Sequence, residues 1–143
     1  MIYQINQTMS VPFIISLLKS LDSFYTFNDD MLPTDIKKEE ILNLSSFLSP
    51  NLILIHGSFV TKIRYSPNSE SDLDLIIASF KKSFWNYNYL NETIRNRFYS
   101  LSNAIKFDIS LISPYEVYNH IYERTSLGIS ILQGVSILYP EGL

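Results

Sequence analysis

Cysteine is absent from this 143-residue sequence, and glycine occurs only four times. Without cysteine, disulfide frameworks, thiol nucleophiles and cysteine-ligated zinc are excluded. The lack of disulfides is compatible with a reducing compartment, so we expect a cytoplasmic protein. A chain of about 140 residues buries roughly two thirds of its unfolded surface. Residues 1–143 are therefore expected to form a single domain that needs no structural metal.

Long hydrophobic runs are missing as well. The longest apolar stretches, such as Leu52 to Ile55, are far shorter than the roughly 18 residues that a membrane-spanning helix needs. The opening MIYQINQTMS contains no basic segment, so no secretory signal is predicted. We therefore expect no association with a membrane.

Charge is scarce and slightly acidic in balance. Charged residues make up 17% of the chain, against about 25% in a typical soluble domain, and the net charge is −3. The acidic balance gives no strong signal for nucleic-acid binding, which requires a concentrated basic face. The ten tyrosines and nine phenylalanines leave two interpretations open. Either a partner covers part of an aromatic surface, or the composition reflects codon bias.

Two helices are predicted before residue 51. Apolar residues recur at helical spacing after Ser10, which is the predicted N-cap of a helix that extends to Tyr25. Thr34 is the predicted N-cap of a second helix that runs to about Leu48. We interpret residues 1–50 as an N-terminal helical extension of a core formed by residues 51–143.

Three short segments are predicted to be β-strands: LILIH from Leu52, DLDLIIASF from Asp72, and KFDISLI from Lys106. In the second segment Asp72 and Asp74 alternate with leucines, as the two-residue period of a strand requires. The polar segment 61–71 is expected to be a short helix or turn followed by an exposed loop.

Helices are also predicted in the second half of the chain. One spans about Phe84 to Leu101, where apolar residues lie three or four positions apart. Another begins after Ser113, because Ser-Pro-Tyr-Glu matches a capping box with proline at the first helical position. A turn at Gly134 and a short apolar segment, VSILY, follow. The order of elements predicts an α+β fold, with a small mixed β-sheet and helices packed against it.

Three features that bear on chemistry coincide along the predicted strands. The sequence pairs Gly57 with Ser58 after the first strand, opens the second with Asp72 and Asp74, and places Asp108 in the third. Aspartates two positions apart on one strand face lie about 6 to 7 Å apart. Such a pair is electrostatically costly unless it is solvated, protonated or occupied by a cation. Each feature alone is weak, since Gly-Ser turns and solvated strand edges are common.

Together the three features favour a metal-assisted reaction at phosphate. Carboxylate oxygens suit hard cations such as Mg²⁺, which accepts one or two carboxylates together with phosphate oxygens. Glycine in the Gly57–Ser58 turn lets the backbone approach a ligand, and a following helix N-terminus directs amide donors at an anion. Phosphate recognition beside a carboxylate-held metal indicates phosphoryl or nucleotidyl transfer.

The stretch HGSFVTKIRYSPNSESDLDL, with KFDISLI and the ending LQGVSILYPEG, resembles the minimal nucleotidyltransferases of the DNA polymerase β superfamily. That family has a hydrophobic strand, Gly-Ser, an insert, Asp-hydrophobic-Asp, and a third carboxylate on a later strand. The resemblance runs over residues 52–139. Its motif positions correspond here to Gly57, Ser58, Asp72, Asp74 and Asp108.

The resemblance implies a polymerase β-like nucleotidyltransferase core that transfers a nucleoside monophosphate, with AMP from ATP as the expected case. Asp72 and Asp74 would hold two Mg²⁺ ions, and Asp108 would bind the metal nearer the attacking hydroxyl or accept its proton. Gly57 and Ser58 would hold the triphosphate. An Asp→Asn change at position 72 or 74 is expected to abolish transfer.

Departures from the family pattern lie in the insert. It has thirteen residues, and the Arg-x-x-Gly that often follows Gly-Ser is replaced by Phe-Val-Thr-Lys at 59–62. Lys62 and Arg64 are candidates to reach phosphate from this loop, although loop cations are solvated by default. His56 is expected to be a structural hydrogen-bonding residue, and His120 has no acidic or histidine partner at metal-ligand spacing.

The acceptor is the part of the reaction that the resemblance leaves open. No second domain of the kind that larger relatives use to hold an acceptor is recognised, so a protein partner or a homo-oligomeric site is expected. Minimal nucleotidyltransferases often act as antitoxins that adenylylate a helical ribonuclease toxin, which implies such a partner by analogy. One alternative is a small-molecule adenylyltransferase of the aminoglycoside type. The other is a non-catalytic module that neutralises a partner by contact.

Overall fold

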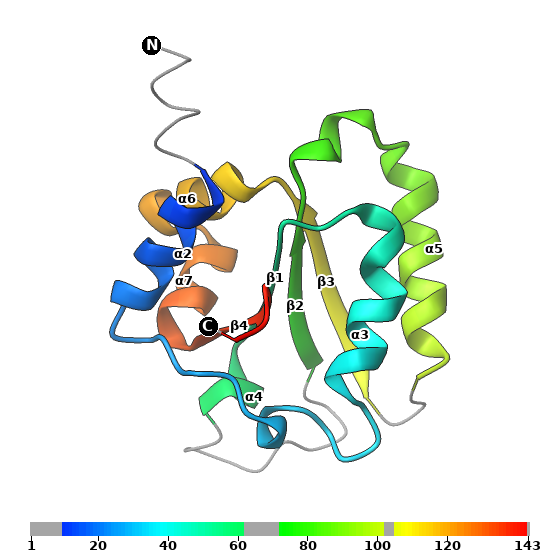
Figure 1. The fold of residues 1–143 in the computed structure, drawn as a ribbon, viewed down its shortest axis with the longest axis horizontal. Helices are drawn as coiled ribbons and strands as arrows, with labels where there is room; N and C mark the ends of the chain where they lie inside the picture. The colour runs from blue at the N-terminus through cyan, green and yellow to red at the C-terminus, as the bar shows by residue number, and fades with distance from the viewer. Residues whose placement is uncertain (1–9, 62–71, 102–104, 143) are drawn as a thin grey trace.

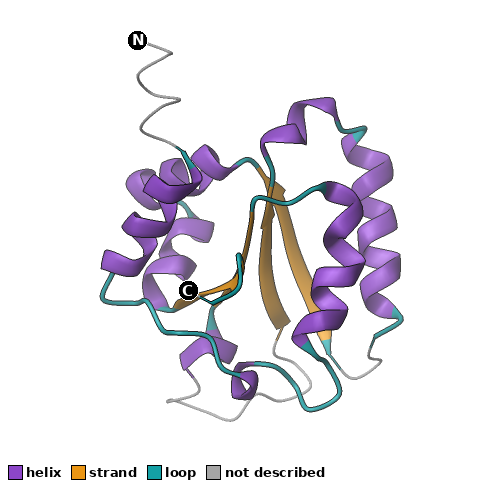
Figure 2. Cartoon of the chain, viewed as in Figure 1, coloured by secondary structure: helices purple, strands orange, loops and turns teal. Residues whose placement is uncertain are grey.

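A four-stranded mixed sheet lies between two layers of helices (Figure 1). The computed structural model describes residues 10–61, 72–101 and 105–142. Within these residues it contains six α-helices and one sheet, and it confirms the predicted α+β class with helices packed on a small mixed sheet (Figure 2).

The predicted strands are all present, and the segment VSILY adds a fourth. Their bounds are β1 Leu52–His56, β2 Asp72–Ala78, β3 Lys106–Ile112 and β4 Val135–Tyr139. The order across the sheet is β3-β2-β1-β4, with β1 antiparallel to both of its neighbours and β2 parallel to β3. The first residues of β2 and β3 therefore lie at the same end of the sheet as the last residue of β1.

Helices cover both faces of the sheet (Figure 1). One layer contains α2 Val11–Ser20, α6 Pro114–Glu123 and α7 Ser126–Gln133. The other layer contains α3 Lys38–Ser45 and α5 Tyr87–Tyr99. The short helix α4 Ser58–Thr61 follows β1 after one residue, and three 3₁₀ helices are η1 Asp29–Met31, η2 Ser46–Leu48 and η3 Phe80–Phe84.

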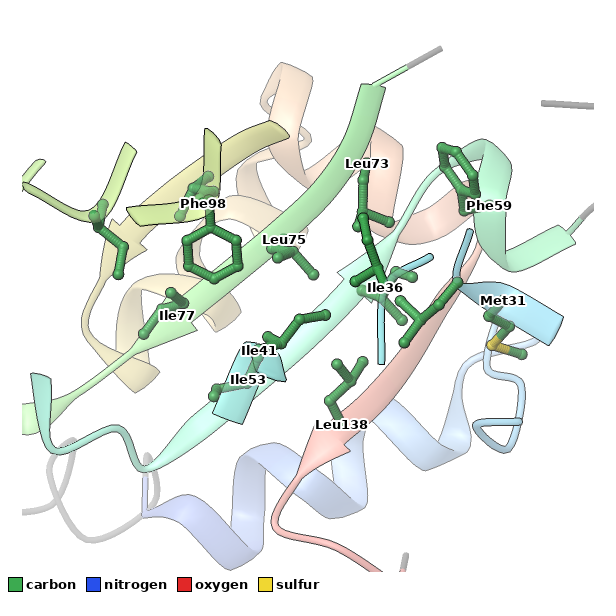
Figure 3. Packing of buried hydrophobic residues seen from close by; sticks show 14 of the residues in the cluster. Met31, Ile36, Ile41, Ile53, Phe59, Leu73, Leu75, Ile77, Phe98 and Leu138 are labelled. Carbon is green, nitrogen blue, oxygen red and sulfur yellow. The ribbon is translucent and has the colours of Figure 1, made fainter. Parts of the chain in front are cut away.

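Alternation along the strands produces two apolar clusters, one on each face of the sheet. Figure 3 shows the cluster on the α3 and α5 side, which includes Ile41, Ile53, Leu75, Ile77, Phe98 and Leu138. The cluster on the other face joins α2, α6 and α7 to the strands through Ile14, Leu18, Leu52, Leu54, Ile76, Val117 and Ile131. The two helices of the predicted N-terminal extension thus pack on opposite faces, each within one of these clusters.

The first helix begins where the sequence predicts and ends early. Ser10 is the N-cap of α2, but the predicted extension of this helix to Tyr25 is wrong, because α2 ends at Ser20. The chain beyond it pairs with β4 instead. The Tyr25 N–H donates to the Val135 carbonyl, and the Val135 N–H donates to the Ser23 carbonyl, both at 2.9 Å. Backbone groups after the helix therefore find partners at the sheet.

The second helix also starts later than predicted. Its N-cap is Lys37 rather than Thr34, because a turn closes first, with the Ile36 N–H donating to the Pro33 carbonyl at 3.0 Å. The 3₁₀ helix η2 then continues α3 to the predicted end at Leu48. The third predicted helix is shorter at both ends than predicted, since α5 starts at Tyr87 after its N-cap Asn86 and ends at Tyr99. The 3₁₀ helix η3 precedes it.

The final helical segment is two helices rather than one. The capping box at Ser113 is confirmed at the start of α6. Arg124 then adopts a left-handed conformation with φ 53°, which ends α6, and the side chain of Thr125 caps α7. The two helices approach so closely that a Cβ atom on Gly128 would overlap the carbonyl oxygen of His120. Periodicity along the sequence did not predict this break.

Two further expectations concern membrane-spanning helices and the long insert. Among the helices in the described ranges, none combines the length and the hydropathy of a bilayer-spanning segment. The predicted exposed loop with Lys62 and Arg64 falls at 62–71, outside the described residues.

Candidate functional site

The predicted motif residues come together at one end of the sheet. His56 is the last residue of β1, and Gly57 and Ser58 lead directly into α4. Gly57 has a φ of 85°, in the left-handed region that favours glycine, and its N–H donates to the Gly134 carbonyl at 3.1 Å. The expected glycine turn after a buried strand is therefore present, and it is tied to the start of β4.

The three aspartates project from the two strands beside this turn. Asp74 of β2 lies opposite Asp108 of β3 in the parallel register, and opposite His56 of β1 in the antiparallel register. Asp72, two residues earlier in β2, shares the face of Asp74 because side chains alternate along a strand. Asp72 and Asp74 are half-buried, and Asp108 is exposed. The carboxyl groups of Asp74 and Asp108 are close enough to share a hydrogen bond.

Asp74 is the most perturbed carboxyl group of the described residues. Burial raises its pKa from the usual 3.8 to about 7, with further contributions from the charges of Asp108 and Asp72 and from the hydrogen bond to Asp108. Two neighbouring carboxylates repel each other, so one of them holds its proton to a higher pH. At neutral pH the Asp74–Asp108 pair is therefore poised between sharing a proton and accepting a cation.

The turn and the carboxyl pair are in direct contact. A Cβ atom placed on Gly57 would lie 2.5 Å from Asp74 Oδ2 and 3.6 Å from Ser130 Oγ. The carboxyl group of Asp74 thus occupies the space that any side chain at position 57 would need. Glycine is required here both by the backbone conformation and by the close approach of Asp74.

Gly57→Ala is expected to lower the free energy of unfolding by about 1 to 2 kcal/mol, because alanine is strained at this positive φ and its methyl group displaces Asp74. Gly142→Ala is a matched control, since Gly142 has a φ of 80° and nothing within 4 Å of its Cβ position. Urea unfolding of both variants measures the difference. An equal loss in the two variants would show that the contact with Asp74 contributes nothing.

His56 is buried next to Asp74 and is hydrogen-bonded to a residue of α7. Its side chain is 4% exposed, and its Nδ1 atom is hydrogen-bonded to Ser130 Oγ at 2.7 Å. Burial lowers the pKa of His56 from 6.5 to about 4, so the ring is neutral at physiological pH. His56 is thus a hydrogen-bonding residue of the buried scaffold, consistent with the structural role expected for it.

Ser130→Ala is expected to cost about 1 to 2 kcal/mol of stability, because it leaves the buried Nδ1 of His56 without its partner. Ser126→Ala, on the exposed surface of the same helix, controls for the higher helix propensity of alanine. Thermal or urea unfolding would reveal the difference between the two variants. Equal stabilities would mean that the hydrogen bond to Ser130 is energetically neutral.

The three aspartates supply only part of the ligand set that a hard divalent cation needs. In the described ranges, no group of three or more histidine, cysteine, aspartate or glutamate side chains is arranged to hold one ion. The described structure therefore brings Asp74 and Asp108 together, but it does not gather Asp72 with them into a three-ligand cluster. Mg²⁺ commonly takes only one or two carboxylates and fills its other positions with water and phosphate oxygens. The carboxyl pair, which would release its proton to such a cation, is compatible with that mode.

Ion pairs elsewhere do not compete for these aspartates. The two seen among the described residues are Lys38–Glu141 and Lys82–Glu116. His120, the second histidine, has a structural partner. Its Nδ1 atom is hydrogen-bonded to Thr125 Oγ1 at 2.7 Å.

Sequence reasoning missed Ser130. It belongs to α7, far from the motif in sequence, and contacts His56 across 74 positions. The only signal in the sequence is a polar residue within the apolar run GISIL, which does not indicate a contact with the Gly57 turn.

Comparison with known proteins identifies no relative of this chain. No family model, curated protein or solved structure matches the chain. The case for an activity therefore rests on the geometry of this site and on the motif that the sequence carries.

Proposed function

We propose that the protein is a Mg²⁺-dependent nucleotidyltransferase that moves a nucleoside monophosphate, AMP from ATP in the expected case, onto a hydroxyl group. The observation that carries the proposal is the register of Asp74 and Asp108 on parallel strands, in contact with the left-handed Gly57 turn after β1. A carboxyl pair that can hold a cation, next to a turn that leads into a helix N-terminus, is the arrangement that metal-assisted transfer at phosphate requires.

The Gly57–Ser58 turn is the proposed site for the triphosphate. At Gly57 the space for a side chain is filled by the Asp74 carboxyl, and the N–H donates to the Gly134 carbonyl, so the phosphate would bind at Ser58. Ser58 is half-buried at the start of α4, and its hydroxyl and backbone amide would donate to the anion. The contact between Gly57 and Asp74 then places the phosphates next to the carboxyl pair.

Asp74 and Asp108 are the proposed cation ligands, with Asp72 beside them on the same strand face. When bound, Mg²⁺ would neutralise charge on the entering and leaving oxygens. Cation binding at the pair would displace the proton that Asp74 holds, since the pKa of this carboxyl is raised to about 7. Mg²⁺ affinity is therefore expected to increase from pH 6 to pH 8.

The transfer step involves one bond made and one broken. The acceptor oxygen attacks the α-phosphorus, and the bond from this phosphorus to the bridging oxygen of the β-phosphate breaks, which releases pyrophosphate. The hydroxyl proton passes to Asp108, which is exposed and so accessible to an acceptor. His56 does not act as the base in this step, because its pKa is about 4 and its Nδ1 is engaged by Ser130.

A partner protein is the proposed source of the hydroxyl group. Aromatic side chains gather on the outer surface of α2 and α6, where the rings of Tyr118 and Tyr122 stack at 5.9 Å and Phe13 lies 6.3 Å from Tyr118. Tyr122 is 75% exposed. An exposed aromatic surface of this kind is typical of protein interfaces. The proposed biological setting is a cytoplasmic antitoxin that modifies a helical toxin, or a homo-oligomer.

The test is transfer of radioactive label in the presence of Mg²⁺. The protein is incubated with host lysate and with each of the four nucleoside triphosphates labelled at the α-phosphate, and in parallel with ATP labelled at the γ-phosphate. We expect a discrete labelled product from the α-label and none from the γ-label. Label from the γ-phosphate alone would indicate phosphoryl transfer and would contradict the proposal. The same conclusion follows if no label is transferred and calorimetry detects no nucleotide binding.

A further inference from the structure

A cavity lies on the β3 side of the carboxyl pair, away from the Gly57 turn. Its volume is about 660 Å³, and its lining includes Asp72, Arg95, Tyr99, Lys106, Phe107 and Asp108. A volume of this size is within the range that holds a small ligand or a few residues of a peptide. The cavity therefore reaches two of the three aspartates from the edge of the sheet that β3 forms in the described structure.

Two cations distinguish this cavity from the rest of an acidic chain. Arg95 projects from α5, and Lys106 opens β3 directly opposite Asp72 in the parallel register. Both side chains are exposed, and in the part of the chain that the structure describes neither takes part in an ion pair. Arg95 Nε donates to Asn91 Oδ1 at 3.5 Å, which leaves the other guanidinium donors free for a ligand.

The order of strands gives this cavity a place in the proposed reaction. In an in-line displacement the entering oxygen approaches phosphorus from the side opposite the leaving group. With the triphosphate at the Gly57–Ser58 turn after β1, pyrophosphate leaves on the β1 side of the carboxyl pair. The acceptor must then enter from the β3 side, which is where the cavity lies.

We propose that this cavity is the acceptor site and that it selects a hydroxyl-bearing residue of the partner protein flanked by acidic side chains. This inference rests on the proposed nucleotidyl transfer for the role of the site. The preference for an anion applies when Mg²⁺ occupies the aspartates, because Arg95 and Lys106 are then the uncompensated charges of the lining. The hydroxyl group would lie at Asp108, and the neighbouring carboxylate would bind Arg95 and Lys106. Tyr99 and Phe107 supply the apolar part of the lining.

The same charges disfavour a polycationic acceptor. An aminoglycoside in this cavity would place ammonium groups near Arg95 and Lys106, and the aspartates that could attract it would be occupied by the metal. The cavity therefore argues against the small-molecule alternative of the aminoglycoside type. A small phosphate compound shares the chemistry of an acidic peptide, and the experiment separates the two.

The binding test is made in the presence of Mg²⁺ and uses phenyl phosphate as the probe, with phenol and phenyltrimethylammonium as neutral and cationic probes carrying the same ring. Chemical shifts of the isotope-labelled full-length protein are followed at Arg95, Lys106 and Phe107. We expect phenyl phosphate to bind at these residues at least about tenfold more tightly than either control probe. The double variant R95Q/K106Q should lose about tenfold or more in affinity for phenyl phosphate. The double variant K19Q/K81Q, which removes two exposed lysines elsewhere, should not.

Several results would overturn the inference: equal binding of the cationic probe, shifts confined to other residues, or undiminished phenyl phosphate binding by R95Q/K106Q. Calorimetry with Mg-ATP on the same samples separates this failure from failure of the proposed function. If Mg-ATP binds and phenyl phosphate does not, only the acceptor inference is wrong. If phenyl phosphate binds in the cavity but Mg-ATP binds nowhere, the anion site stands and its acceptor role is refuted.

A transfer assay identifies the source of the acceptor. Lysate labelled from α-labelled ATP is separated by ultrafiltration into macromolecules and small molecules. Label retained with protein, and lowered about tenfold or more by R95Q/K106Q but not by K19Q/K81Q, is the expected result. Label found only in the small-molecule fraction would overturn the commitment to a partner protein. Transfer to protein that both double variants support equally would refute the acceptor site.

Discussion

Replacing Asp74 or Asp108 by asparagine is expected to lower nucleotidyl transfer by about a thousandfold or more. Asparagine keeps the shape of aspartate but removes the charge that a cation needs and the base that accepts the hydroxyl proton. The two aspartates are in register and share a hydrogen bond, so the loss of either one dismantles the pair. The double variant is expected to be no worse than the single ones, because residues that act as a unit are not additive.

Initial rates of label transfer measure this prediction, with Asp22→Asn as the matched control on an exposed turn. The control should retain the wild-type rate. Transfer at more than about a tenth of the wild-type rate in either pair variant would show that the carboxyl pair is not the catalytic centre. Asp72→Asn, measured alongside, reports whether this residue, which the structure leaves outside a three-ligand cluster, still contributes to cation binding.

The same Asp74→Asn change is expected to stabilise the protein, and more so at alkaline pH. The folded state holds a proton on Asp74 up to about pH 7, whereas the unfolded chain releases it near 3.8. Between these values the folded protein binds more protons than the unfolded one, so the stability of the wild type falls as pH rises. Asparagine cannot ionise and avoids this loss. We expect the variant to be more stable by about 3 kcal/mol at pH 8, after allowance for partial solvent screening.

His56 produces the opposite dependence over part of the same range. Its pKa is about 4 in the folded protein and 6.5 in the unfolded chain, so the unfolded state binds the extra proton between these values. Stability from His56 is therefore complete above pH 6.5 and lost as pH falls towards 4. In the wild type the slopes from Asp74 and His56 offset each other from about pH 4 to 6.5.

Urea unfolding of the wild type and Asp74→Asn at pH 5 and pH 8 tests the direction of both pH dependences, the one from Asp74 and the one from His56. The stability difference between the two proteins should widen by about 2 kcal/mol from pH 5 to pH 8. The variant alone should become less stable as pH falls below 6.5, because the slope from His56 is no longer offset. A stability difference that stays constant with pH would show that the Asp74 carboxyl is not perturbed by its neighbours.

The sequence was sufficient to predict the sheet and the motif because these depend on local patterns. Strand alternation around Asp72 and Asp74 requires only a period of two, and the capping box at Ser113 requires only four consecutive residues. The sequence predicts that Asp108 can converge with Asp74 if β2 and β3 are neighbours, whereas the register that sets them opposite each other comes from the structure. Asp74 and Gly57 are therefore candidate site residues on the sequence alone, and in the structure they are in contact.

Features that depend on tertiary packing were not predictable in this way. The early end of α2 is explained by backbone pairing between residues near Tyr25 and β4, which periodicity does not encode. The contact between Ser130 and His56 depends on where α7 lies against the sheet, and that position follows from the left-handed turn at Arg124. The cations at the proposed acceptor cavity come from α5 and β3, so no local motif joins them.

The most direct test of the site is calorimetric titration with Mg²⁺ and a non-hydrolysable ATP analogue whose α,β-bridging oxygen is replaced by methylene. The wild type should bind the analogue with Mg²⁺ and lose most of the affinity when the metal is chelated, and Asp74→Asn should behave as the chelated wild type does. Binding that is unchanged in Asp74→Asn, or that needs no divalent cation, would contradict the assignment of Asp74, Asp108 and the Gly57 turn to a single metal–nucleotide site.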